Sequence, residues 1–209
     1  IFPHHENEIA QSCGATGKEF ARYWIHNGFV QINQEKMSKS LGNFFTIREI
    51  FAKSDWSKEI TGESLRYYLL TNHYRGPLDF SDQGLREAKY ALDGFYGLFN
   101  RLKETAKTES PVNEKLTAII GRTRLAFGQA MDDDFNTPGA IAEMQGFRSE
   151  VNKLLEPGLS TKAREQARQT FRSLGSVLGL FQLEEWRFNV DFSDVGIKGL
   201  TDDEINRLR

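Results

Sequence analysis

The feature that most constrains this chain is a series of apolar stripes at helical spacing, which fills most of the sequence after Ser81. Apolar residues recur there at steps of three and four, the spacing that keeps side chains on one face of an α-helix. Four such stripes joined by short links predict an antiparallel bundle with the stripe residues in its core. In chain order the stripes are Leu85, Ala88, Leu92, Phe95, Phe99 and Leu102; Leu116, Ile119, Ile120, Phe127, Ala130 and Met131; Ile141, Met144, Phe147, Val151 and Leu154; and Ala163, Ala167, Phe171, Leu174, Leu178 and Phe181.

The sequence before Ser81 has a mixed pattern of short helices, a strand and a loop. Thr46 and Glu49 have capping-box spacing, in which each side chain accepts a hydrogen bond from the other residue's backbone N–H. Pro3 suits a helix start because its missing N–H would have no partner there. The predicted elements are a helix over 5–13, a strand over 29–32, a loop over 36–43, a helix after Thr46 and a helix over 62–73.

Composition excludes several classes of protein. The 209 residues are 39% hydrophobic, enough for one large or two small domains with a real core, and the net charge of −2 argues against a generally basic nucleic-acid binder. Cys13 is the single cysteine, so an internal disulfide is impossible and a reducing compartment is expected. No apolar run has the length of a membrane helix. The chain opens at Ile1 without an initiator Met, which we interpret as a cut inside a larger protein.

The strongest motif is Lys36-Met37-Ser38-Lys39-Ser40, followed by a glycine at Gly42. Two lysines three residues apart on a loop can form a mobile cationic clamp, since a lysine ammonium suits phosphate oxygens. Such a clamp would stabilise the charge that grows on a departing pyrophosphate. The alternative is a solvated basic loop, which a pair of lysines alone would favour.

The second motif is a His- and Glu-rich stretch at the predicted first helix. His4 and Glu8 are four residues apart, so on a helix they face the same way. Imidazole nitrogen and carboxylate oxygen are both zinc ligands, although two ligands do not complete a site. Other pairings with His5 and Glu6 remain open, as does a purely structural role for acids near a helix start.

The third motif is the acidic run from Asp132 to Asp134, followed by Asn136 and Thr137. Consecutive acids lack the alternating ligand pattern of a hard-cation site. We therefore favour a structural role, with Asn136 or Thr137 capping the third bundle helix and Pro138 in its first turn.

Together these motifs resemble the cysteinyl-tRNA synthetases, and the lysine loop resembles the signature loop shared by class I aminoacyl-tRNA synthetases. The resemblance covers nearly the whole chain to about Leu183 and is most specific in its first and last segments. The segments that carry it are Phe2–Ser12, Glu35–Phe45, Leu65–Leu70 with His73–Arg75, and Asp132–Pro138.

The resemblance implies a cysteine–tRNA ligase that uses ATP with Mg²⁺ and holds one zinc. His4 and Glu8 match two of its zinc ligands, and the two cysteine ligands would lie upstream of Ile1; Cys13 matches neither. Lys36 and Lys39 are the expected catalytic residues, and the loop Lys36, Met37, Ser38, Lys39 and Ser40 the expected ATP-binding residues. The resemblance implies that the partners are cysteine, ATP and tRNA(Cys). It also implies a monomeric protein in the cytoplasm that binds no membrane. The chain alone is expected to be inactive.

The implied fold is mostly α. Residues 1–33 would end a Rossmann-type catalytic domain, 34–81 would form the signature-loop and stem-contact region, and 82–183 an antiparallel helical bundle of the anticodon-binding type. Beyond the part that the resemblance covers, residues 184–209 would begin a further C-terminal segment, in which the pattern Thr201–Glu204 is typical of a helix start.

Three further functions remain open on the sequence. The cysteine ligase of mycothiol biosynthesis resembles the same catalytic core, although the run at 132–138 favours the tRNA enzyme. A non-catalytic tRNA-binding helical module would also fit, as would a helical scaffold with a coincidental lysine loop. Arg66 and Arg75 are candidates either for tRNA or loop contacts or for structural salt bridges.

Overall fold

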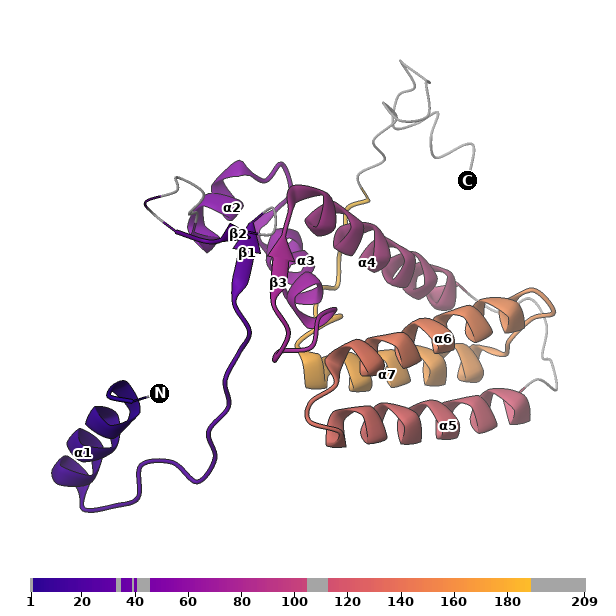
Figure 1. The fold of residues 1–209 in the computed structure, drawn as a ribbon. Coiled ribbons are helices and arrows are strands. Elements are labelled where there is room, and N and C mark those ends of the chain that lie inside the picture. The colour runs from indigo at the N-terminus through magenta and orange to yellow at the C-terminus, as the bar shows by residue number, and fades with distance from the viewer. Residues whose placement is uncertain (1, 33–34, 39, 41–45, 105–112, 189–209) are drawn as a thin grey trace.

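A computed structural model describes residues 2–32, 35–38, 40, 46–104 and 113–188. The fold is mostly α, as the sequence predicts, with a small sheet in its N-terminal half (Figure 1). The elements are α1 (His4–Thr16), β1 (Val30–Ile32), β2 (Glu35–Lys36), α2 (Ile47–Lys53), α3 (Lys58–Leu70), β3 (Leu78–Phe80), α4 (Asp82–Lys103), α5 (Asn113–Asp132), α6 (Thr137–Leu155) and α7 (Thr161–Leu178).

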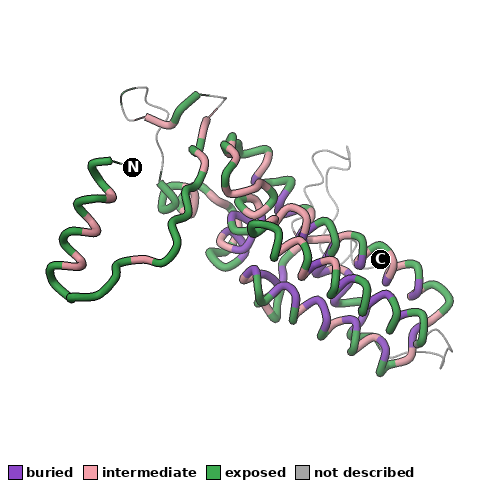
Figure 2. The backbone as a smooth tube through the Cα atoms, turned by 60° about the horizontal axis from the view of Figure 1, so that its bottom comes forward, coloured by how far each residue is buried: buried purple, intermediate pink, exposed green. Residues whose placement is uncertain are grey.

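Helices α4 to α7 form the predicted bundle, with successive helices running in opposite directions (Figure 1). Their buried faces turn inward and are the main purple region of Figure 2. Phe95, Phe147 and Phe171 lie at the centre, and Phe171 contacts both of the others. One stripe residue differs from the prediction: Phe181 lies beyond the end of α7, with φ +62°, although it is still buried.

Side-chain caps fix where three of the bundle helices, α4, α6 and α7, start. Ser81 accepts a hydrogen bond from the N–H of Gly84 at the start of α4, and Ser160 caps α7 in the same way. Of the two candidates for α6, Asn136 is the cap, and it accepts from Gly139 N–H at 2.9 Å. The Thr137 hydroxyl instead donates to the carbonyl of Leu70 at the end of α3, 2.9 Å away.

The sheet has the order β2-β1-β3, with β1 antiparallel to β2 and parallel to β3. The predicted strand over 29–32 is confirmed as β1, but β2 and β3 were not predicted because two or three residues carry no readable alternation. The loop predicted from Lys36 therefore begins one residue too early. The helix predicted over 62–73 starts at Lys58, because Ser57 caps it, and ends at Leu70.

Helix α1 and the segment that follows it stand away from the rest of the molecule (Figures 1 and 2). The helix matches the predicted one but is longer at both ends, and it buries no residue. Exposed large side chains follow it at Phe20, Tyr23, Trp24 and Ile25. The bundle, α3 and β3 therefore hold the core, whereas α1 contributes none of it.

The predicted boundaries at 33/34, 81/82 and 183/184 stay predictions, although α4 does begin at Asp82. The helix start predicted at Thr201–Glu204 lies outside the described residues, as do Lys39 and Leu41–Asn43 of the signature loop.

Candidate active site and its support

The face of α1 brings His4 and Glu8 together, as their spacing predicts. His4 Nδ1 lies 4.0 Å from Glu8 Oε1, and both side chains reach solvent. Zinc ligands lie about 2.0–2.1 Å from the metal, so two ligands of one tetrahedral ion are separated by roughly 3.4 Å. A small rotation of either side chain would reach that separation, so the pair fits half of a zinc ligand set.

His5 takes a different direction from His4. Its ring stacks on Trp24 at 4.5 Å and on His26 at 5.0 Å, so it connects α1 to the segment that follows it. Desolvation by burial lowers the pKa of His5, and the nearby His26 lowers it further. Sequence reasoning missed Trp24 and His26, because nothing in their spacing relates them to the helix.

No group of three or more His, Cys, Asp or Glu side chains in the described part of the chain lies close enough to enclose a metal ion. A complete zinc site would therefore need ligands in addition to His4 and Glu8.

The β1–β2 hairpin carries the start of the signature loop. Lys36 ends β2, with Nζ 5.1 Å from the centre of the Phe29 ring. Two residues further on, the hydroxyls of Ser38 and Ser40 lie 2.7 Å apart. The described lysine of the loop is thus held at a strand end beside an aromatic face, the geometry of a cation–π contact.

Helix α2 follows the loop and begins with the predicted capping box. Thr46 accepts from Glu49 N–H, and Glu49 Oε2 accepts from Thr46 N–H at 2.6 Å. These bonds to Thr46 lower the pKa of the Glu49 carboxyl, so it stays ionised and able to cap. The loop is therefore bounded by a hairpin before it and a capped helix after it.

The loop after α3 connects the sheet to the bundle. Arg75, which the sequence left open between a tRNA contact and a salt bridge, donates to Asp134 from Nε at 2.5 Å and from Nη2 at 3.1 Å. Tyr74 donates to the same carboxylate at 2.7 Å. These bonds, first from Arg75 and then from Tyr74, lower the pKa of Asp134 to about 2. The acidic run thus has a structural role, but through Asp134 as well as the predicted cap.

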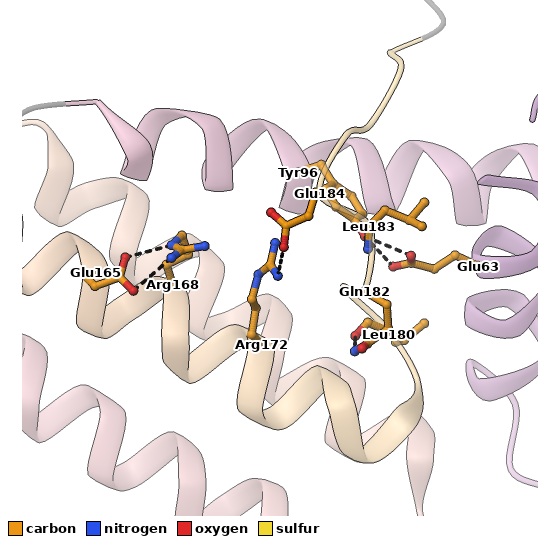
Figure 3. A network of polar contacts seen from close by, with 9 residues as sticks. All are labelled: Glu63, Tyr96, Glu165, Arg168, Arg172, Leu180, Gln182, Leu183 and Glu184. Atoms are coloured by element: carbon orange, nitrogen blue, oxygen red, sulfur yellow. Dashed lines mark hydrogen bonds and ion pairs between the residues drawn. The ribbon is translucent and has the colours of Figure 1, made fainter. Parts of the chain in front are cut away.

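A buried carboxylate joins α3 to α4 and to the segment after α7 (Figure 3). Glu63 Oε1 accepts from Phe181 N–H at 2.7 Å and Tyr96 OH at 3.0 Å, and Leu183 N–H donates to the same hydroxyl. Beside it, Arg172 pairs with Glu184 at 2.6 Å. No local pattern in the sequence points to Glu63, because its partners lie up to 118 positions away.

Two family models match separate parts of the chain. Residues 1–90 match the family model of the class I (C) tRNA synthetase catalytic domain, and residues 126–182 match the DALR domain. A solved structure, the ternary complex LeuRS–tRNA–LeuAMS of Agrobacterium radiobacter K84, has a chain that matches with a TM-score of 0.57 at 17% identity. It covers 84% of this chain and 25% of that one, and supports the fold alone. The matched family models place the chain among the class I aminoacyl-tRNA synthetases, and its fold agrees with that class.

Curated relatives narrow the assignment within that class. The cysteine–tRNA ligase of Syntrophotalea carbinolica is 44% identical over 98% of this chain, and that of Pseudomonas aeruginosa (strain LESB58) is 48% identical over 90%. The chain belongs to the cysteine–tRNA ligase family. It spans 43% of the first relative's length and 37% of the second's.

Within the described residues, no helix is both long enough and apolar enough to cross a bilayer.

Proposed function

We propose that this chain is part of a cysteine–tRNA ligase and supplies half of its zinc site, its signature loop and a tRNA-binding bundle. The observation that carries the amino-acid specificity is the 4.0 Å approach of His4 and Glu8 on one helix face. Two relatives, at 44% and 48% identity, are cysteine–tRNA ligases, which supports the reaction.

The first step of the proposed reaction activates cysteine. A carboxylate oxygen of cysteine attacks the α-phosphorus of ATP, and the bond to pyrophosphate breaks, giving cysteinyl-adenylate. Lys36 and Lys39, with Met37, Ser38 and Ser40 completing the loop, would contact the ATP phosphates and stabilise the charge on the departing Mg²⁺-bound pyrophosphate. Most of this catalysis comes from positioning and charge stabilisation.

The second step transfers the cysteinyl group to tRNA. A ribose hydroxyl of the terminal adenosine attacks the adenylate carbonyl, AMP leaves, and an ester forms. The bundle α4–α7 would hold the body of tRNA(Cys) while its end reaches the adenylate. We further propose that the ligase is a monomer in the cytoplasm, as the family resemblance implies.

His4 and Glu8 would hold the zinc together with two further ligands. When bound, the ion would supply a soft-ligand site for the thiolate of the substrate, which serine cannot match with its hydroxyl. A site of this kind rejects the oxygen analogue without an editing step.

The test compares two substitutions with the same chemistry in the full-length ligase that contains this chain. Glu8→Gln removes a proposed zinc ligand, whereas Glu6→Gln makes the same change two residues away on α1. We expect the Glu8 variant to lose zinc and cysteine-dependent ATP–pyrophosphate exchange, and the Glu6 variant to keep both. A wild-type enzyme without metal, or one that activates serine as readily as cysteine, would refute the proposal.

A second measurement separates the ligase from a cysteine ligase of mycothiol biosynthesis. Charging of tRNA(Cys) by the intact enzyme is the expected result, since the similarity to cysteine–tRNA ligases extends through the bundle. The affinity of the chain for tRNA should also fall steeply as salt rises, because phosphate contacts release counterions. A flat salt dependence would argue against phosphate contact.

A further inference from the structure

The turn between α5 and α6 holds an unusual backbone. Asp134 and Phe135 have φ angles of +52° and +54°, a left-handed conformation that residues with a Cβ adopt at an energetic cost. Backbone bonds hold the turn in place: Phe135 N–H donates to Met131 O, and Asn136 N–H to Ala130 O. Such a conformation persists only where the surrounding structure requires it.

This backbone conformation directs the Asp134 carboxylate toward Tyr74 and Arg75 in the loop after α3. Asp134 accepts from Tyr74 OH at 2.7 Å and from two nitrogens of Arg75 at 2.5 and 3.1 Å. An arginine that donates two hydrogen bonds to one carboxylate is held in direction as well as in distance. An exposed ion pair alone adds little stability, so the geometry is the informative property.

Tyr74, which Asp134 holds, also contacts the segment that enters the hairpin, and Leu78 further along the same connection adds a second contact. The carbonyl of Tyr74 accepts from Gly28 N–H at 2.7 Å, and Leu78 N–H donates to Phe29 O at 2.9 Å. Gly28 lies so close to Gly76 that an added Cβ would overlap the carbonyl oxygen of Gly76. The hairpin leads directly to Lys36 and the signature loop.

Other roles for the turn are weaker. Asn136 already caps α6, so capping does not require Asp134. Direct contact with RNA is disfavoured, because Asp132 and Asp133 would repel phosphates at the same turn. The remaining role for Asp134 is a contact between two parts of the molecule, the bundle and the loop after α3.

We propose that Asp134 is a positioning residue: through Tyr74 and Arg75 it fixes the bundle relative to the hairpin that carries the signature loop, and so sets where a bundle-bound tRNA presents its acceptor end. This rests on the proposed function. Activation of cysteine needs no tRNA, so the two half-reactions should respond differently to loss of the bridge.

The test uses Asp134→Asn with Asp133→Asn as its matched control in the full-length ligase. Asparagine tolerates the left-handed backbone and keeps the shape, but loses the charge that pairs with Arg75. We expect both variants to retain ATP–pyrophosphate exchange, and Asp134→Asn alone to lose about tenfold in kcat/KM for tRNA charging, chiefly through KM, a typical size for coupling between sites. Combining it with Arg75→Gln should cost little more than either change alone.

Equal charging by the Asp134 and Asp133 variants would overturn the proposal, as would an equal loss of exchange and charging, which indicates a merely structural role. A structural readout on this chain is independent of activity. Spin labels at Ile47→Cys and Leu125→Cys, both exposed sites, in a Cys13→Ser background report the distance between α2 and the bundle. Asp134→Asn should broaden that distance and Asp133→Asn should not. If the wild-type enzyme neither exchanges nor charges, the proposed function fails while this readout still decides the role of Asp134.

Discussion

At the scale of single residues, Glu63 is a carboxylic acid placed almost entirely out of contact with water. It is 6% exposed, and its hydrogen bonds come from Tyr96 and the backbone of Phe181. Burial raises the pKa of Glu63, and the bonds from Phe181 and Tyr96 oppose that rise only in part. Burial, together with the charge of Glu63, also raises the pKa of Tyr96, so the phenol stays protonated and donates.

Removing this carboxylate should destabilise the chain. Glu63→Ala leaves the Phe181 N–H and the Tyr96 hydroxyl buried without an acceptor, and we expect a loss of about 2–4 kcal/mol in the free energy of unfolding. Glu63→Gln retains an acceptor and should cost less than half as much. Urea unfolding followed by tryptophan fluorescence measures both; equal effects of the two changes would contradict the role as acceptor.

The raised pKa also predicts a pH dependence with a definite sign. An acid whose pKa is higher in the folded state binds its proton more tightly there, so its stabilising contribution is present below the unfolded pKa, near 4.5, and is lost as pH rises through the folded pKa. The stability of wild type relative to Glu63→Gln should therefore increase as pH is lowered from 7 toward 5. A difference in the free energy of unfolding between wild type and Glu63→Gln that does not change with pH would contradict this prediction.

At the scale of elements, the sequence predicts whatever is local. The four bundle helices, the Thr46–Glu49 capping box and the shared face of His4 and Glu8 all follow from residues within a few positions of each other. Strands β2 and β3 do not, because they owe their pairing to tertiary contacts. The start of α3 is a different case: its cap, Ser57, is a local signal, and the sequence prediction placed the start too late. The bridge from Asp134 to Arg75 spans 59 positions and leaves no local signal.

Helix α2 should depend on its cap more than the longer helices depend on theirs. It has seven residues and no buried one, so the capping box is a large part of what holds it. Thr46→Ala should speed hydrogen exchange of α2 amides several-fold without changing exchange in the bundle. Ser160→Ala at the start of α7 is the control, and α7 should stay protected because its packed face holds it.

Two glycines in bundle helices should respond to alanine with opposite signs. A Cβ on Gly175 would overlap the Phe181 ring and lie 2.9 Å from the Leu180 carbonyl oxygen, so Gly175→Ala should cost about 1–3 kcal/mol. Nothing lies within 4 Å of a Cβ on Gly121, so Gly121→Ala should stabilise α5 by about 0.5–1 kcal/mol. Urea midpoints compare the pair, and two shifts of the same sign would contradict the packing argument.

At the scale of the whole molecule, long-range polar contacts join parts that the sequence treats separately. Glu63 connects α3 to α4 and the segment after α7, and Asp134 connects the bundle to the loop beside the hairpin. Thr137 adds a bond from α6 to the end of α3. Polar contacts thus join the bundle to α3 and to the loop after α3 at several points. Helix α1, in contrast, stands away from the rest of the molecule (Figure 1).

The chain by itself should not activate cysteine. It spans 43% of the length of a 44%-identical ligase, and α1, which carries His4 and Glu8, buries no side chain. We expect no ATP–pyrophosphate exchange above background with this chain, and clear exchange with the full-length ligase assayed in parallel. Robust exchange by the chain alone would mean that its residues complete an active site without further parts.

The exposed aromatic segment between α1 and the hairpin has a practical consequence for anyone handling this polypeptide. Lys18 and Arg22 are exposed there, so we expect trypsin to cut after them and to break the backbone between α1 and the rest of the chain. The larger product still carries the exposed apolar residues Tyr23, Trp24 and Ile25 at its new amino end, where they favour aggregation. A polypeptide shortened to begin at Asn27 lacks these apolar residues. It should stay monodisperse at concentrations where the tryptic product aggregates.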